Sequence, residues 1–133
     1  MSTNITNEPI FTELDFLRIT RLNNGKIPLE LKHLLSDAEV LSSYSIPETI
    51  ITMNSKLILR NTQDKSTQTV TLCYPHNADP NKGMFSVLSP IGMSIIGRRT
   101  GDCINWKTPN GNSHSMVIEQ ILYQPEANGD YLV

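Results

Sequence analysis

The chain has 133 residues, of which 38% are hydrophobic and 18% are charged, and its net charge at pH 7 is −2. This length suits one domain with a hydrophobic core plus a small appendage, and the composition excludes a disordered chain. The near-neutral charge argues against broad, phosphate-driven binding of nucleic acid. No apolar run reaches the roughly 20 residues of a membrane helix, and the first residues lack signal-peptide features, so we expect a cytoplasmic protein.

The N-terminal third predicts a disordered tail over residues 1–10 and a helical hairpin over residues 11–43. Thr12 is the expected N-cap of the first helix, with Asp15 three residues later, and Phe11 and Phe16 are spaced as a hydrophobic staple. That helix should stop near residues 23–25, where the turn-forming sequence Asn-Asn-Gly occurs. Apolar residues on one narrow stripe predict a second helix over residues 28–41.

The rest of the chain has strand-like patterning after a linker at residues 42–48. We predict strands at residues 56–61, 67–74, 84–88, 103–108 and 115–124, the last with a bulge near residues 119–120. A short helix should begin at Ser89 and Pro90 and end at Gly97. Residues 44–124 would form this second domain, and residues 125–133 a loosely held tail. The predicted fold class is therefore α+β, a short antiparallel helical hairpin followed by an antiparallel sheet with one short helix.

The sequence contains no motif of a known catalytic or phosphate-binding site. Ser113, His114 and Ser115 are neighbours on a predicted strand, where adjacent side chains point to opposite faces and cannot pair as nucleophile and base. The three histidines (His33, His76 and His114) fall in different elements, so we interpret them as solvated or capping residues and expect no metal or other cofactor.

The two cysteines, an arginine pair and the single tryptophan can each be interpreted as structural residues or as part of a site. Cys73 and Cys103 lack a C-x-x-C pattern and are interpreted as free, buried thiols, with a disulfide as the alternative. Arg98 and Arg99 are interpreted as solvated residues at a helix end, with a phosphate-binding role as the alternative. Trp106 is interpreted as a core residue rather than a ligand platform.

Several segments resemble the Rnk family, called regulator of nucleoside diphosphate kinase, within the Gre-like transcription factors. They are IPETIITMNSKL at residues 46–57, VTLCYPHNAD at 70–79, SVLSPIG at 86–92 and LYQPEANGD at 122–130. Residues 89–108 also resemble the C-terminal domain of the bacterial Gre transcript-cleavage factors. The resemblance covers roughly residues 11–130 and implies an FKBP-like C-terminal domain, a truncated N-terminal coiled coil and RNA polymerase as the partner.

The resemblance implies two candidate sites. Leu88, Ser89, Pro90 and Ile91 correspond to the loop and helix start with which Gre factors grip the polymerase. The hairpin tip consists of Asn23, Asn24, Gly25 and Lys26. Gre factors carry acidic residues at this tip that help to hold a catalytic metal, and a hard cation such as Mg²⁺ prefers carboxylate oxygens, which this tip lacks.

We therefore expect a non-enzymatic regulator that binds RNA polymerase near the secondary channel, competes with Gre-type factors and influences nucleoside diphosphate kinase levels. One alternative is a Gre paralogue that stimulates transcript cleavage. The other is an FKBP-type prolyl isomerase, suggested by the fold alone.

Overall fold

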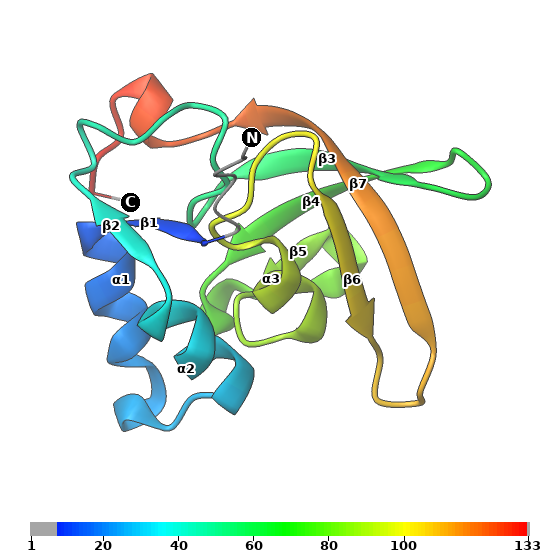
Figure 1. Ribbon diagram of the computed structural model, residues 1–133, viewed down its shortest axis with the longest axis horizontal. Helices are drawn as coiled ribbons and strands as arrows, with labels where there is room; N and C mark the ends of the chain where they lie inside the picture. Colours follow the sequence, from blue (N-terminus) through cyan, green and yellow to red (C-terminus); the bar gives the residue numbers. More distant parts are fainter. Residues whose placement is uncertain (1–7, 133) are drawn as a thin grey trace, which may run out of the picture.

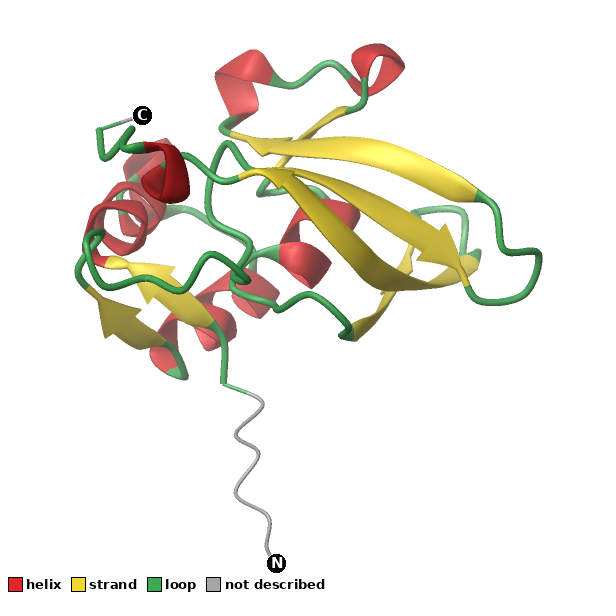
Figure 2. Ribbon diagram, turned by 90° about the horizontal axis from the view of Figure 1, so that it is seen from above, coloured by secondary structure: helices red, strands yellow, loops and turns green. Residues whose placement is uncertain are grey.

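The computed structural model describes residues 8–132 (Figure 1). Two short helices and a two-stranded sheet lie at one end, and a curled five-stranded sheet that surrounds a third helix lies at the other (Figures 1 and 2). In chain order the elements are β1 (Ile10–Thr12), α1 (Glu13–Thr20), η1 (Leu22–Gly25), α2 (Leu29–Ser36), β2 (Glu39–Leu41), β3 (Lys56–Asn61), β4 (Thr67–Cys73), η2 (Pro75–Asn77), η3 (Pro80–Lys82), β5 (Met84–Ser86), α3 (Pro90–Ile95), β6 (Cys103–Lys107), β7 (Ser113–Tyr123) and η4 (Glu126–Asn128).

The large sheet has the strand order β5-β4-β3-β7-β6. Its pairs are antiparallel except β4 and β5, which are parallel, so the prediction of an all-antiparallel sheet was wrong. The loop at residues 74–83, which contains η2 and η3, carries the chain back beside Thr71, so β5 begins there and runs in the same direction as β4. The predicted bulge in β7 is confirmed, because the register against β3 shifts at Glu119 and again at Leu122.

We call residues 9–41 the helical unit, because they contain α1, α2 and the two short strands that flank them. Each helix has eight residues, which corresponds to about 12 Å of length. The expected longer arms are therefore not found, and α2 ends at Ser36 instead of continuing to residue 41. Residues 39–41 instead pair in parallel with β1 as β2, because the backbone of β1 offers hydrogen-bond partners there.

The start of the helical unit corrects the predicted N-terminal tail. Residues 1–7 lie outside the described residues, but Pro9 and Ile10 are buried, and Ile10 begins β1. The backbone N–H of Ile10 donates to the carbonyl oxygen of Gly97 at 3.1 Å, which fixes the helical unit to the end of α3. Gly97 has a φ of +77°, and a Cβ there would lie 2.8 Å from Cβ of Pro9, so this contact requires glycine.

The predicted cap of α1 is confirmed. Thr12 Oγ1 accepts a hydrogen bond from the N–H of Asp15 at 3.0 Å, and the rings of Phe11 and Phe16 meet edge to face. The Asp15 carboxylate lies close enough to the cap for the Thr12 side chain to lower its pKa, but its partner at 3.0 Å is more distant in the sequence. That partner is the backbone N–H of Met53, from which Asp15 accepts a hydrogen bond.

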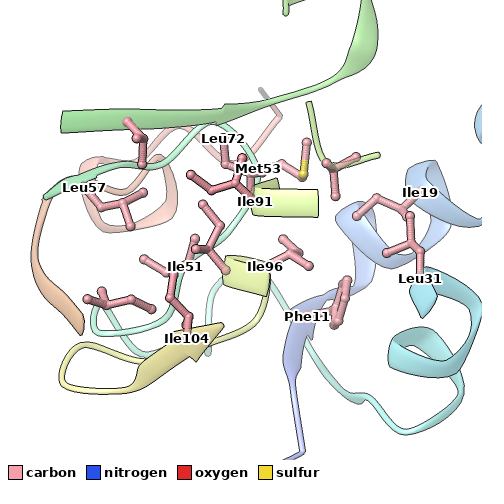
Figure 3. Close-up of a cluster of buried hydrophobic side chains, with 14 of the residues drawn as sticks. Phe11, Ile19, Leu31, Ile51, Met53, Leu57, Leu72, Ile91, Ile96 and Ile104 are labelled. Atoms are coloured by element: carbon pink, nitrogen blue, oxygen red, sulfur yellow. The ribbon is translucent and has the colours of Figure 1, made fainter. Parts of the chain in front are cut away.

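One hydrophobic core joins the helical unit to the large sheet. Figure 3 shows Phe11, Ile19 and Leu31 of the helical unit next to Met53 and Ile96, which continue into the residues of the sheet. Alternating buried residues of β3, β4 and β7 supply the sheet side: Leu57, Leu59, Val70, Leu72, Met116 and Ile118. Burying each large side chain contributes about 2 kcal/mol, so this core holds the two parts together.

Residues 125–132, which we call the C-terminal strap, are folded onto the molecule, so the prediction of a loose tail was wrong. Pro125 and Glu126 are buried, and the ring of Tyr131 lies 4.3 Å from that of Tyr44. The guanidinium of Arg18 donates to the carbonyl oxygen of Leu132 at 3.2 Å. Figure 1 shows this red segment beside the linker and the start of α1. Local patterning could not reveal these contacts, because their partners lie far away in the sequence.

Candidate functional site

An open cleft of about 1220 Å³ lies between the helical unit and the curled sheet. One wall is α2, a second is the start of α3 with the turn that follows it, and a third is the β6–β7 hairpin. Its lining includes Glu30, His33, Asp37, Pro90, Met93, Arg98, Arg99, Asp102, Trp106, Lys107 and His114. The cleft brings together elements that are distant in the sequence.

The start of α3 is built by a compact turn at residues 86–92. The hydroxyl of Ser89 accepts from the N–H of Gly92 at 3.1 Å and donates to the carbonyl oxygen of Ser86 at 2.6 Å, which confirms Ser89 as the N-cap. A Cβ on Gly92 would lie 2.0 Å from that same Ser86 oxygen. Only glycine allows the backbone of α3 to approach the preceding loop so closely.

This turn separates the four residues predicted to contact a partner. Leu88, Ser89 and Pro90 are half-buried, and Pro90 lines the cleft. Ile91 is buried in the core, so its side chain is not available to a partner, and its place in the predicted site was wrong. The reason is the helical spacing, which directs Ile91 and Ile95 inward while Pro90 remains at the surface.

Trp106 and His114 form a stacked pair on the β6–β7 hairpin. They are opposite residues in the antiparallel register, with ring centroids 5.1 Å apart and ring planes 16° apart. Trp106 packs partly against the core and also lines the cleft, so the interpretation as a core residue holds only in part. The pair was missed from the sequence. The turn at residues 109–112 sets the register, and counting outward from it would have placed the two rings opposite each other.

The charged residues of the cleft are of both signs. Arg98, Arg99, Asp102 and Lys107 lie on the side of the sheet, whereas Glu30 lies on α2 and Asp37 directly follows it. Arg98 and Arg99 are half-buried rather than solvated, because their backbone pairs with residues 50 and 51. The mixture gives the cleft no strong field of one sign, which fits a polypeptide better than a phosphate backbone.

The predicted hairpin tip is an exposed left-handed turn. Asn23, Asn24 and Gly25 all have positive φ, and the Asn23 amide donates to the carbonyl oxygen of Lys26 at 3.0 Å. Asparagine and glycine are the residues that adopt this conformation most readily. The tip carries no carboxylate, and the structure does not bring it together with the residues at the start of α3.

The two cysteines, which the sequence suggested as free thiols or a disulfide, lie apart in the structure. Cys73 and Cys103 are both free, but Cys103, on the edge strand β6, is exposed and lines the cleft. Burial raises the pKa of the Cys73 thiol. Over residues 8–132 no group of three histidine, cysteine or acidic side chains is arranged to hold a metal ion. Within the same range, no helix has the length and apolar character needed to cross a membrane.

A buried acidic group lies at the junction of the helical unit and the large sheet. Asp15 is 2% exposed, and loss of solvation raises the pKa of its carboxyl group from 3.8 to about 6. Hydrogen bonds from the N–H of Met53 and from Thr12 lower this pKa but do not offset the burial. Burial and the neighbouring Asp15 raise the pKa of Tyr74, whose hydroxyl donates to Asp15 Oδ1 at 3.5 Å.

Comparison with known proteins places this architecture in a family. The model of the transcription elongation factor GreA/GreB C-terminal domain matches residues 46–123. The chain is 36% identical over 99 residues to the regulator of nucleoside diphosphate kinase of Escherichia coli K12, covering 74% of this chain and 73% of that protein. It is 29% identical over 90 residues to the transcription elongation factor GreA of Helicobacter hepaticus, covering 68% of this chain and 55% of that protein.

A solved structure shows the same fold. The GreA/GreB transcription elongation factor of Nitrosomonas europaea is 30% identical and superimposes with a TM-score of 0.76, covering 89% of this chain and 100% of that one. The matched family domain contains the large sheet, α3 and two walls of the cleft. The chain therefore belongs to the Rnk family of Gre-like transcription factors, which carry a GreA/GreB-type C-terminal domain.

Proposed function

We propose that this protein is a non-enzymatic regulator of transcription that binds RNA polymerase near its secondary channel, through the cleft, in competition with Gre-type factors. One observation carries the proposal. Pro90, at the helix start that corresponds to the polymerase-gripping segment of Gre factors, lines the same cleft as Trp106. Leu88 and Ser89 immediately precede Pro90 in the chain and would form the rim of the contact.

The chemistry of the cleft suits a protein partner. Trp106 and Met93 are residue types that are enriched at the centres of protein interfaces, and charges of both signs surround them. Trp106 is already oriented by its stack with His114, so little side-chain entropy would be lost on binding. The net charge of −2 removes the electrostatic attraction that direct nucleic-acid binding requires.

The helical unit argues against stimulated transcript cleavage. We take α1 and α2 as a shortened counterpart of the Gre coiled coil, and the large sheet with α3 as the FKBP-like domain. Helices of eight residues extend about 12 Å, and the tip at residues 23–26 offers only amides, glycine and a lysine. Neither the reach nor the ligands suit delivery of a metal ion to a distant catalytic centre.

An effect on nucleoside diphosphate kinase levels follows from the name of the Escherichia coli relative. We propose that such an effect would act through transcription, because the family domain that matches residues 46–123 is that of a transcription elongation factor.

The test is the affinity of purified RNA polymerase for the full chain and for single variants. We expect Trp106→Ala to weaken binding by about 30-fold, which is typical of an interfacial tryptophan, and Pro90→Ala to weaken it by a smaller factor. Leu122→Ala is the control, because Leu122 is exposed but does not line the cleft. Absence of binding by the parent protein, or equal binding by all variants, would contradict the proposal. Transcripts in backtracked complexes should shorten no faster when the protein is added.

A further inference from the structure

A short loop at residues 52–55 is held from two sides by buried carboxylates that come from opposite ends of the chain. Asp15, on α1, accepts a hydrogen bond from the N–H of Met53 at 3.0 Å through Oδ2. Its other oxygen lies 3.5 Å from the hydroxyl of Tyr74, at the end of β4. One carboxylate of the helical unit therefore bonds to two separate parts of the large sheet domain.

The second carboxylate belongs to the C-terminal strap. Glu126, which is 9% exposed, accepts a hydrogen bond from the hydroxyl of Thr52 at 2.7 Å. That hydroxyl is also 3.0 Å from Oγ of Ser55, which accepts from the N–H of Thr52. The loop is thus closed on itself by Thr52 and Ser55, and Glu126 holds it from the side of the strap.

The strap also returns to the helical unit. The Arg18 guanidinium donates to the carbonyl oxygen of Leu132, and Tyr131 stacks against Tyr44 in the linker. Helical unit, loop and strap therefore form a closed circuit of contacts around one end of the molecule. Nothing in this circuit lines the cleft, but α2, which forms one wall of the cleft, is in contact with α1, which carries Asp15 and Arg18.

We propose that Asp15, Thr52, Ser55 and Glu126 form a clamp that fixes the placement of the helical unit on the sheet domain, and so sets the position of α2 as a wall of the docking cleft. Hydrophobic burial is non-directional and tolerates small shifts between packed surfaces, whereas buried hydrogen bonds fix one arrangement. These residues are positioning residues, since they do not line the cleft themselves. The link to docking rests on the proposed function, whereas the clamp itself does not.

The clamp is tested without any partner by measuring one distance in the full chain. Spin labels on Asn24→Cys, at the exposed tip, and on the native exposed Cys103 report the placement of the helical unit relative to the sheet. We expect a single narrow distance distribution for this labelled parent. Asp15→Ala and Thr52→Val, each added to it, should broaden the distribution or add a second distance.

Two variants serve as controls. Asp15→Asn keeps an oxygen that can accept from the N–H of Met53, and should preserve the narrow distribution. Glu13→Ala removes an exposed carboxylate two residues away on the same helix, and should also leave it unchanged. Thr52→Val is nearly isosteric, so it decides the question if Asp15→Ala does not fold. Distributions as narrow as that of the labelled parent in the folded clamp variants would overturn the proposal, and so would equal broadening in Glu13→Ala.

The consequence for docking is measured separately, on unlabelled protein. If the clamp variants hold the competent placement in about one tenth of the population, their apparent affinity for RNA polymerase should fall about tenfold. If the parent does not bind polymerase, the proposed function fails while the distance measurement still decides whether the clamp exists. If the distances change and affinity does not, the clamp stands, but its role in shaping the cleft is refuted.

Discussion

Protonation of Asp15 should make the folded protein more stable as the pH falls from 7 towards 4. The pKa of this carboxyl group is raised from 3.8 to about 6, chiefly because burial removes the carboxylate from water, with the nearby Glu126 charge acting in the same direction. Arg18 and the hydrogen bonds from Met53 and Thr12 act in the opposite direction, and the Tyr74 hydroxyl faces the same group. The folded state therefore takes up this proton at a higher pH than the unfolded state does.

The magnitude follows from the difference of about two pKa units between the folded and unfolded states. It corresponds to about 3 kcal/mol of unfolding free energy, absent at pH 7, gained as the pH falls through 6 and complete below 3.8. The other carboxyl groups of the protein titrate in the same range, so the measurement compares the parent with Asp15→Asn, which cannot titrate at this position.

Urea unfolding at a series of pH values provides the comparison. Relative to the parent, Asp15→Asn should be most stable at pH 7 and should lose about 2.4 kcal/mol of that advantage by pH 4, and about 3 kcal/mol once the pH is well below 3.8. A difference that does not depend on pH would refute the reasoning, because it would mean that burial does not control this carboxylate. A difference of the opposite sign would mean that the hydrogen bonds to the ionised form outweigh the loss of solvation.

Three other predictions concern the sheet domain. Gly92→Ala should lower the unfolding free energy by about 3 kcal/mol or more, because the added Cβ would lie 2.0 Å from the Ser86 oxygen; a urea midpoint equal to the parent's would contradict this. Cys103 should react with a thiol reagent at once in the native protein, and Cys73 only on unfolding, so two rapid equivalents would show that the burial is wrong. Trp106 is the chain's one tryptophan and is partly buried, so its emission in the parent should shift on unfolding, and Trp106→Phe should abolish that shift. An emission spectrum of the folded parent equal to that of the unfolded protein would contradict the partial burial.

Elements specified by local chemistry could be predicted from the sequence. The caps at Thr12 and Ser89 were correct, because a hydroxyl at the N-cap binds a backbone N–H only two or three residues away. Strand β3 was located by the apolar run Leu57–Leu59 between polar residues, and β4, to within one residue, by the alternation of Val70 and Leu72 with polar residues. Even the bulge in β7 was visible, since the alternation slips where the register shifts.

Features that depend on distant partners were missed. Strand β2 has three residues and exists only because β1 lies beside it, so its residues were predicted as the end of a helix. The strap looked like a polar tail, since Glu126 gains its partner only when Thr52 is brought to it by the fold. The helix start at Ser89 and Pro90 was predicted, whereas the Trp106–His114 pair was missed, because stacking across a hairpin depends on register rather than on composition.

The most direct test of polymerase docking is competition on purified RNA polymerase. Polymerase carrying a labelled Gre factor is titrated with this protein, and the Gre factor that remains bound is measured. We predict that the parent protein displaces the Gre factor in a saturable way, and that Trp106→Ala needs about 30-fold more protein for the same displacement. A polymerase that neither retains this protein nor loses its Gre factor would contradict docking through the cleft.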